Sequence, residues 1–226
     1  MNESRPRVAI LGGTGKEGPG LALRWAYAGY SIIIGSRQLE KARTVAQELN
    51  QQLGIDSIQG MENSAAALMA DICVLTVVQA AHQQALEGLK QDLQGKILVD
   101  ATARVDFRNP QPPSPPAAAR YAQNLLGPGV RVVAAFQNVP AHALKNNLGG
   151  SIDTNVLVCS DDLPAAEEII LLAQAAGMRA YYAGGLDNAV VVEGLTSILI
   201  SLNKHYGTRT ASIEITGIHT PLSQAK

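Results

Sequence analysis

Short apolar runs alternate with longer segments of mixed polarity along most of the chain. Buried strands of a parallel sheet have this appearance, because both faces of such a sheet are covered. The pattern predicts strands at 8–11, 31–35, 71–77, 96–100 and 130–136, separated by helices at 17–28, 39–53, 63–69, 82–93 and 116–126. Strands that alternate with helices imply parallel pairing through right-handed crossovers.

The last third of the chain is patterned differently. A proline-rich loop at 109–116 precedes it, and its predicted strands and helices are 156–159, 163–176, 178–182, 188–205 and a strand-like tail at 211–218. Asp161 and Asp162 are expected to cap the helix that follows them. The predicted fold is α/β, a Rossmann-type doubly wound, mostly parallel sheet with a small C-terminal α+β subdomain. We expect a nucleotide-binding domain at 1–136 and a smaller region for a second substrate, a lid and dimerisation at 137–226.

A glycine cluster directly follows the first predicted strand. Gly13, Gly15 and Gly18 have the G-x-G-x-x-G spacing, and a helix begins at once after them. In dinucleotide-binding units this loop lets the backbone approach the pyrophosphate, which lies at the helix N-terminus. We therefore expect the loop, with Lys16 and Glu17, to bind a dinucleotide. The alternative is a flexible glycine turn without a ligand.

The end of the second strand indicates which dinucleotide is bound. NAD-binding units usually carry an acidic residue there for the ribose hydroxyls. This chain has Ser36 and Arg37, with Lys41 about one helical turn later. Hydroxyl and cationic groups suit the extra phosphate of NADP, which a carboxylate would repel. Cations at a helix N-terminus oppose the helix dipole, so a merely solvated helix start explains them less well.

Composition and charge exclude several classes of protein. Of the 226 residues, 46% are hydrophobic and 16% charged, and the net charge of -1 argues against nucleic-acid or anionic-membrane partners. We expect no membrane span and no signal peptide. Cys73 and Cys159 lie in apolar runs and are expected to be buried, reduced thiols, which predicts a cytoplasmic protein.

Several longer segments give the chain a family resemblance. It resembles the F420-dependent NADP reductases, which pass a hydride between NADPH and the deazaflavin coenzyme F420. The resemblance extends from Arg7 to Ile218, and the segments that carry it are LGGTGKEG at 11–18, GSRQLEKA at 35–42, IDTNVLVCSDD at 152–162 and VEGLTSILISLNKHYG at 192–207.

The resemblance implies roles for individual residues and a homodimeric assembly. Thr14 would contact phosphate beside the glycines, and Ser36, Arg37 and Lys41 would bind the NADP phosphate. The nicotinamide side of the cleft would be lined by residues that follow two of the strands: Thr76, Val77, Val78, Gln79, Ala101, Thr102 and Ala103. The residues implied for the acceptor are Gln137, Asn138, Val139, Pro140 and Thr196.

Departures from the family pattern fall on the acceptor side. Val78-Gln79 stands where the family often has Pro-Trp, Gln137-Asn138 where it has His, and Gly194 where it has Ser or Ala. A flavin, quinone or metal-type acceptor therefore remains an alternative to F420, as does a non-enzymatic NADP-sensing module.

The sequence suggests no dedicated acid–base chemistry. Hydride transfer needs two rings held face to face with water excluded, so we expect neither a catalytic acid or base nor a metal site. His82 is expected to cap a helix or face solvent. Glu193 is expected to be paired or to face an interface, and not to be catalytic.

Overall fold

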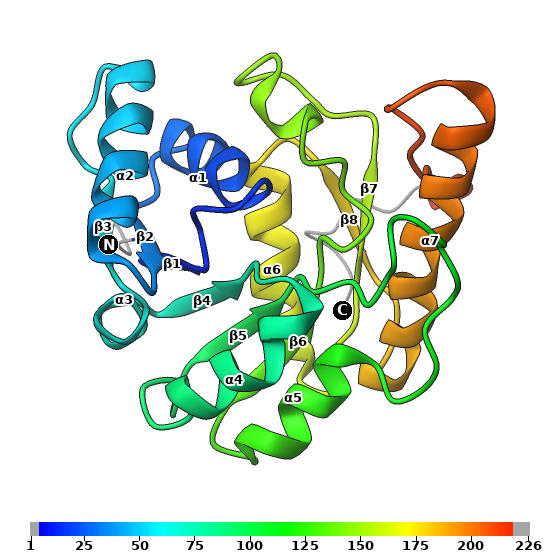
Figure 1. Ribbon diagram of the computed structural model, residues 1–226, viewed down its shortest axis with the longest axis horizontal. Coiled ribbons are helices and arrows are strands. Elements are labelled where there is room, and N and C mark those ends of the chain that lie inside the picture. The colour runs from blue at the N-terminus through cyan, green and yellow to red at the C-terminus, as the bar shows by residue number, and fades with distance from the viewer. Residues whose placement is uncertain (1–4, 219–226) are drawn as a thin grey trace.

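The computed structural model describes residues 5–218, which contain a six-stranded parallel sheet with the order β3-β2-β1-β4-β5-β6 (Figure 1). This is the doubly wound order of dinucleotide-binding folds, in which ligands bind outside the carboxyl ends of the strands. Its strands are β1 (Val8–Leu11), β2 (Ile32–Ser36), β3 (Gln59–Glu62), β4 (Ile72–Leu75), β5 (Ile97–Asp100) and β6 (Arg131–Ala134).

Helices cover both faces of this sheet. The helices α1 (Gly18–Tyr27), α2 (Leu39–Leu53) and α6 (Leu163–Ala175) contribute to the apolar core on one face. The other face is covered by α3 (Asn63–Met69), α4 (Gln79–Leu89) and α5 (Ala118–Leu126). Figure 1 shows α4 and α5 below the sheet and α1 and α6 above it, so parallel strands are buried on both sides, as their continuous apolar runs predict.

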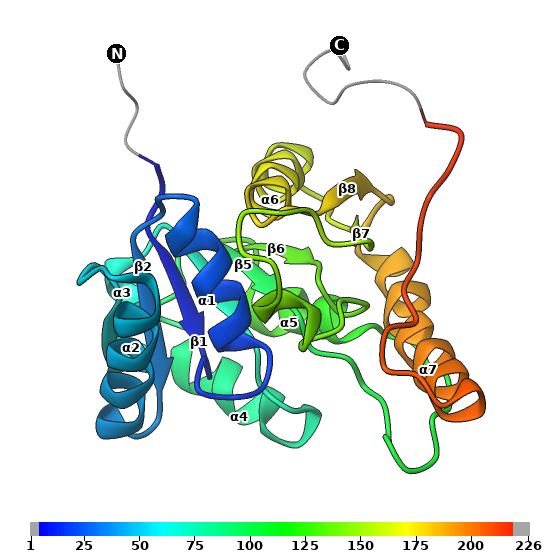
Figure 2. The same cartoon turned by 90° about the horizontal axis from the view of Figure 1, so that it is seen from above.

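The C-terminal third adds a second, smaller sheet and a long helix. Strands β7 (Asn155–Val158) and β8 (Arg179–Tyr182) are parallel to each other. The end of β7 meets the end of β6 through an antiparallel bridge between Ala134 and Cys159. Helix α7 (Ala189–Tyr206) lies at one side of the molecule, away from α1 and α2 (Figures 1 and 2).

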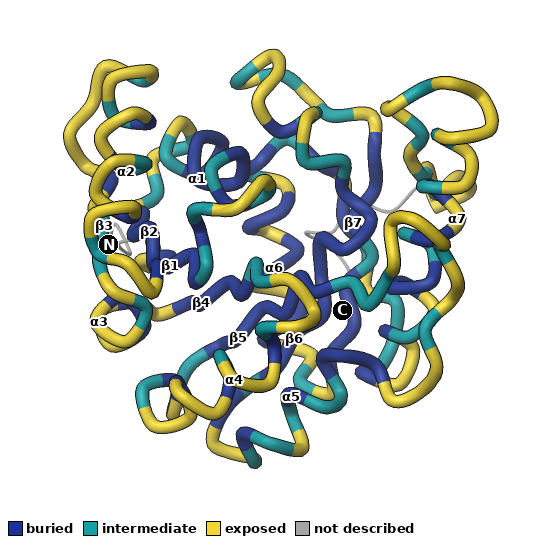
Figure 3. Tube along the Cα trace, in the orientation of Figure 1, coloured by how far each residue is buried: buried dark blue, intermediate teal, exposed yellow. Residues whose placement is uncertain are grey.

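The apolar core crosses from the main sheet into this C-terminal part. One cluster joins Ile10 and Trp25 of the first βα unit with Val156 and Ile169 of the later elements, all fully buried. Burial in Figure 3 is continuous along the central strands and β7, whereas much of α2 and the turns at the sheet edges are exposed. The main sheet and the β7–α6–β8 unit therefore share one packed interior.

Among residues 5–218, the predicted helices and strands are largely confirmed, with three differences. Strand β3 was not predicted, because at this edge of the sheet its residues are at most half-buried and lack an apolar run. Helix α4 begins at Gln79 and not near His82. The predicted strand at 211–218 is wrong: these residues are irregular, although the carbonyl of Ile213 accepts a hydrogen bond from the backbone N–H of Asn155.

The expected cap of α6 is confirmed for Asp162 but not for Asp161, whose carboxylate accepts hydrogen bonds from Arg120 and from the backbone N–H of Leu186. The Asp162 carboxylate accepts a hydrogen bond of 2.8 Å from the backbone N–H of Ala165 and so caps α6. Cys73 and Cys159 are free and buried. Burial raises the pKa of the Cys73 thiol to about 12 and that of Cys159 to about 11, so both are unreactive at neutral pH.

One helical stretch has the length and composition of a membrane span, although no span was expected from the sequence. In the described part of the chain, the helical stretch Leu186–Tyr206 is long and apolar enough by length and composition, and 39% of its most apolar window is buried. Its inner side contacts α5 and approaches Pro112 and Pro113 at Gly194. It is a packing helix of this fold, not a span.

Candidate functional site

The turn between β1 and α1 has the close backbone contacts that the glycine spacing predicts. A Cβ atom on Gly18 would lie 2.5 Å from the carbonyl oxygen of Gly13, so only glycine lets α1 start this close to the strand. The left-handed residue of the turn is Gly12, with φ of 72°. It lies one position before Gly13, the first glycine of the G-x-G-x-x-G spacing. A Cβ atom on Gly15 would have no neighbour closer than 3.7 Å, so the backbone there is open to a ligand.

Backbone donors of this turn are available to an anion. The N–H groups of Thr14, Lys16 and Glu17 have no hydrogen-bond partner among residues 5–218. Helix α1 begins directly after them, and its second residue is Pro19, which supplies no N–H group. Free N–H groups at a helix N-terminus form an anion site.

The carboxyl end of β2 presents two cations without acidic partners. Arg37 and Lys41 are exposed, and neither is within ion-pair distance of a carboxylate among the described residues. Ser36 is buried, and its hydroxyl accepts a hydrogen bond of 3.2 Å from the backbone N–H of Gln38. The end of this strand therefore offers unneutralised positive charge beside the glycine turn.

Both features open into one cleft of about 690 Å³ at the carboxyl edge of the sheet. Its volume is within the range of cofactor and ligand sites. Of the predicted site residues it is lined by Thr14, Gly15, Ser36, Arg37, Lys41, Thr76, Val77 and Val78. The predicted nucleotide-binding residues that are not part of its lining are Gly13, Lys16, Glu17, Gly18, Gln79, Ala101, Thr102 and Ala103. None of the predicted acceptor residues lines it either: Gln137, Asn138, Val139, Pro140 and Thr196.

Sequence reasoning missed Asn63 in this cleft. Its side-chain oxygen accepts a hydrogen bond of 3.1 Å from the backbone N–H of Gly12, and it lies against Gly35. Asn63 therefore joins the start of α3 to the glycine turn and to the end of β2. An Asn at the start of a predicted helix was the available signal, but it also fits a simple cap.

Glu17 is the unusual residue of the glycine turn. Its Oε1 atom is buried and has no hydrogen-bond partner within the described range. Burial raises the pKa of this carboxyl group from 4.5 to about 8. Glu17 is therefore largely protonated at neutral pH, which removes a negative charge from the entrance to the anion site.

The structure contradicts the expectation for His82. This residue is 6% exposed, and its Nε2 atom lies 2.6 Å from Oδ2 of Asp100 at the end of β5. Burial alone would lower the pKa of His82, but the hydrogen bond to Asp100 and the charges of Asp100 and Glu193 raise it overall. His82 thus joins α4 to β5 through a buried hydrogen bond to Asp100, and neither caps a helix nor faces solvent.

A turn at 136–140 follows β6 and is held from several sides. Phe136 has a φ of 75°, which side chains other than glycine rarely adopt. The amide nitrogen of Gln137 donates to the Asp100 carbonyl at 2.8 Å, and that of Asn138 donates to the Asn155 carbonyl at 2.8 Å. Thr196 donates to the carbonyl of Gln137. These side chains hold the turn, while the Gln137 and Asn138 amide oxygens are buried without partners in the described residues.

Glu193 is paired, as expected. Its carboxylate is buried and lies 2.8 Å from Nε of Arg104. Burial raises the pKa of Glu193, and Arg104 only partly offsets this effect. The fully buried Asp100 and Glu193 and the half-buried Arg104 thus bring ionisable groups close to the predicted acceptor residues, which are all neutral. The described residues contain no group of His, Cys, Asp and Glu suited to a metal ion.

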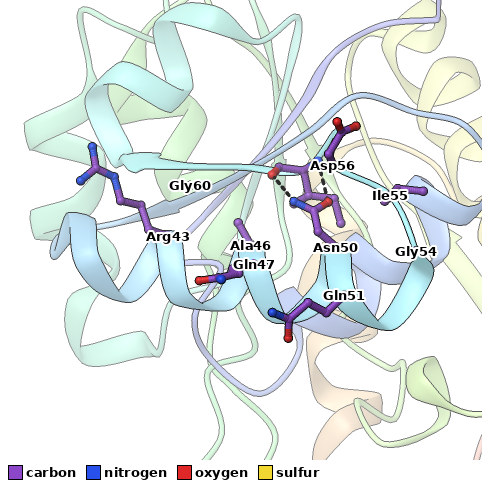
Figure 4. Close-up of a pocket in the computed structure, with 10 residues that line it drawn as sticks. Arg43, Ala46, Gln47, Asn50, Gln51, Gly54, Ile55, Asp56 and Gly60 are labelled. Atoms are coloured by element: carbon purple, nitrogen blue, oxygen red, sulfur yellow. Dashed lines mark hydrogen bonds between the residues drawn. The ribbon is translucent and has the colours of Figure 1, made fainter.

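A second hollow, between α2 and β3, has no comparable chemistry (Figure 4). The side chain of Asn50 donates to the Ile58 carbonyl at 2.9 Å and accepts from the Ile58 N–H at 3.0 Å, so its polar atoms are used within the fold. None of the predicted site residues lines this hollow.

Comparisons with known proteins agree with this geometry. A sequence model of the family described as "NADP oxidoreductase coenzyme F420-dependent" matches residues 7–104. The F420-dependent NADP reductase of Methanothermobacter thermautotrophicus is 40% identical over 222 residues, covering 94% of this chain and 95% of that protein. Metalloreductase STEAP3 of Rattus norvegicus is 30% identical over 192 residues, which cover 84% of this chain and 36% of that protein.

The fold has a similar full-length counterpart among solved structures. A crystal structure from Arthrobacter sp. FB24, described as a candidate F420-dependent NADP reductase, matches with a TM-score of 0.78 and 26% identity. The match covers 94% of this chain and 100% of that one. Similarity therefore extends through both the six-stranded sheet and the C-terminal elements.

Proposed function

Because the chain belongs to the F420-dependent NADP reductase family, we propose that the cleft at the carboxyl edge of its main sheet binds NADP(H) and presents the nicotinamide to F420 beside the turn at 136–140. The chain is an NADP-dependent oxidoreductase that transfers a hydride between these two molecules. The residues that bind each molecule are the subject of the proposal.

The unpaired cations at the end of β2 are the observation that carries the nucleotide assignment. Arg37 and Lys41 are exposed beside a glycine turn with free N–H groups, and no acidic residue follows β2 directly. The pyrophosphate would lie on the turn, with Thr14 as a further donor, and the 2′-phosphate would lie between Ser36, Arg37 and Lys41. A guanidinium gives such a phosphate two parallel hydrogen bonds.

The nicotinamide half would follow the ends of β4 and β5. These strands are neighbours, so Thr76–Gln79 and Ala101–Ala103 lie side by side at the sheet edge. Val78 is 71% exposed there, a large value for an apolar side chain next to a cleft. It offers an apolar face to a planar ring, and burying it would exclude water from the site of transfer.

In this reaction the protein has to hold the two reacting rings in position and to exclude water from the site of transfer. Hydride transfer requires the donor and acceptor carbons to be held about 3–3.5 Å apart with little acid–base assistance. We propose that the turn at 136–140, with Gln137, Asn138, Val139 and Pro140, forms the acceptor side together with Thr196. The bonds that fix this turn support the assignment, because a rigid platform is what such positioning needs.

We further propose that residues 137–226 contribute the acceptor side and a homodimer interface, whereas residues 1–136 bind NADP(H). The exposed apolar residues of α7 support a dimer: Val191, Ile198, Leu202 and Tyr206 are 64%, 52%, 39% and 71% exposed. Residues 219–226 of this range lie outside the described part of the chain. Free buried thiols support a cytoplasmic location.

The direct test mixes purified protein with NADPH and F420 and follows the loss of the oxidised deazaflavin absorbance. We expect turnover with NADPH, much slower turnover with NADH, and the reverse reaction from reduced F420 and NADP. Turnover with free flavin or a quinone but not with F420 would contradict the acceptor assignment. Sedimentation velocity on the same sample tests the dimer.

A further inference from the structure

Arg104 contacts only one of the two carboxylate oxygens of its ion-pair partner, Glu193. Its Nε atom lies 2.8 Å from Oε2 of Glu193, a fully buried carboxylate on α7. The other oxygen of Glu193 accepts a hydrogen bond of 2.6 Å from the backbone N–H of Ala118, the first residue of α5. An arginine and a carboxylate usually pair through two parallel bonds. Here the second oxygen is already used by α5.

The consequence is an unused donor on a guanidinium whose side chain is 21% exposed. The Nη2 atom of Arg104 is buried and has no hydrogen-bond partner among the described residues. A charged donor that is buried without a hydrogen-bond partner destabilises the folded protein, and such donors are therefore rare in native structures. A ligand oxygen that reached this atom would supply the missing bond.

Arg104 is not among the residues that line the nucleotide cleft, but contacts through α7 connect it to the turn at 136–140. Glu193 and Thr196 are three residues apart on α7 and therefore share a helix face. Thr196 binds the carbonyl of Gln137, whose side chain binds the carbonyl of Asp100, four residues before Arg104. Two more unpartnered buried atoms lie along this chain of contacts, Oγ1 of Thr102 and Oε1 of Gln137. The set offers both donors and acceptors at the carboxyl ends of β5 and β6.

We propose that Arg104, anchored by Glu193, donates from Nη2 to a carbonyl oxygen on the pyrimidine edge of the deazaflavin. This inference rests on the proposed function. A deazaflavin presents two carbonyls and an N–H along that edge, which match a guanidinium, a hydroxyl and an amide oxygen. In the transfer, a C–H bond of the dihydronicotinamide breaks and its hydrogen leaves with both electrons to the acceptor ring. The nicotinamide becomes cationic, and the acceptor ring gains negative charge until a proton from water neutralises it.

Arg104 would therefore act more strongly on the reduced acceptor than on the oxidised one. The negative charge spreads over the ring nitrogens and carbonyl oxygens, where a charged donor stabilises it. Arg104 would lower the barrier to transfer and would also select acceptors that carry such an edge. The phosphate groups of NADP(H) would bind at the ends of β1 and β2, away from Arg104, so we expect NADPH affinity not to depend on it.

The experiment distinguishes hydrogen bonding of Arg104 to the acceptor from a role in which Arg104 only neutralises the charge of Glu193. Arg104→Gln alone leaves a buried carboxylate unpaired, so the informative protein is the double variant Arg104→Gln/Glu193→Gln. The amide oxygen of glutamine can still accept from Ala118, and no buried charge remains. We expect a melting temperature near that of the wild type and an unchanged NADPH dissociation constant. F420 affinity, measured by fluorescence titration, and the single-turnover transfer rate should each fall ten- to hundred-fold.

Wild-type F420 affinity and transfer rate in the double variant would overturn the proposal, because Arg104 would then only neutralise Glu193. An equal loss of NADPH and F420 binding would also overturn it. If the double variant does not fold, Arg104→Lys keeps the charge beside Glu193 but lacks the separate Nη2 nitrogen, and it should show the same selective loss for F420. Arg131→Gln is the control and should behave as the wild type, because Arg131 is the first residue of β6, at the end of the strand opposite to the turn at 136–140. Failure of the wild type itself to reduce F420 would refute the proposed function, a separate outcome.

Discussion

The hydroxyl of Thr196 donates a hydrogen bond of 2.8 Å to the carbonyl oxygen of Gln137, and so ties α7 to the turn after β6. The preceding residue, Phe136, has a left-handed backbone and packs its ring edge against Trp25 with centroids 5.7 Å apart. A non-glycine residue in this conformation costs of order 1–3 kcal/mol and persists only where its surroundings hold it. Thr196 is one of the groups that hold it.

Thr196→Val should therefore slow hydride transfer without weakening NADPH binding. Valine has the same shape but no hydroxyl, and a hydrogen bond of this kind contributes about 1 kcal/mol. We expect a several-fold lower single-turnover rate with F420 and an unchanged NADPH dissociation constant. Thr44→Val is the matched control, because the Thr44 hydroxyl bonds only to the carbonyl of Glu40 on the exposed side of α2. Identical rates in wild type and Thr196→Val would show that the turn does not need this bond.

The structural features that the sequence predicts well are those determined by residues close together in the chain. Strands such as β1 are continuous apolar runs because both faces of a parallel sheet are buried, and the glycine turn is encoded within a few neighbouring residues. The cations after β2 belong to the same local unit. Those features suffice for the fold and for the location of the nucleotide cleft.

The contacts missed from the sequence join residues far apart in the chain. Asp100 lies 18 residues from His82, and Arg104 lies 89 residues from Glu193. Their pairing depends on how α4 and α7 pack against the sheet, which no short pattern encodes. A histidine in a predicted helix does not indicate which residue of another element contacts it. For the same reason, the acceptor side is less predictable than the nucleotide side.

Arg37→Asp should move nucleotide preference from NADPH toward NADH. The variant loses a charge-assisted bond to the 2′-phosphate and gains a carboxylate that repels it but can bind ribose hydroxyls. We expect the ratio of kcat/KM for NADPH over NADH to fall at least ten-fold, as a bond of about 1.5–3 kcal/mol implies. Arg43→Asp makes the same charge change on α2 at a residue paired with Glu40, and should leave the ratio unaltered. An unchanged ratio in Arg37→Asp would locate the phosphate elsewhere.

Glu17→Gln should change how stability depends on pH. The pKa of Glu17 is raised from 4.5 to about 8 on folding, so the folded chain holds a proton that the unfolded chain releases. This contribution to stability is full below pH 4.5 and is lost as the pH rises toward 8, with a slope of up to about 1.4 kcal/mol per pH unit. Glutamine mimics the protonated acid and has no such slope.

Urea unfolding of wild type and Glu17→Gln between pH 5 and pH 9 measures this difference. The two proteins should be nearly equal at the acidic end, and the variant should be the more stable at the alkaline end. Glu40→Gln, which changes a side chain 81% exposed on α2, serves as the control and should leave the pH profile of the wild type unchanged. Parallel curves for wild type and Glu17→Gln would mean that the carboxyl group is solvated.

Arg24→Lys should loosen the segment that follows the acceptor turn. The buried guanidinium of Arg24 donates to the carbonyls of Leu144, Asn146, Gly150 and Ala176 at 2.6–2.9 Å. Burial lowers the pKa of Arg24, which has no carboxylate partner in the described range. A lysine has fewer donors and cannot reach all of these carbonyls, so several would be left buried without a partner. At about 1–3 kcal/mol for each such group, we expect a loss of several kcal/mol.

The location of the change distinguishes this effect from general destabilisation. Hydrogen exchange should accelerate in Arg24→Lys first at residues 143–150, before the amides of the central strands, because Arg24 is the group that ties this segment to α1. Since the segment continues from the turn at 136–140, the transfer rate to F420 should fall while NADPH affinity changes little. Arg179→Lys, an exposed substitution beside Glu214, is the control. Uniformly faster exchange over the whole sheet would show that Arg24 supports the global fold and not this segment.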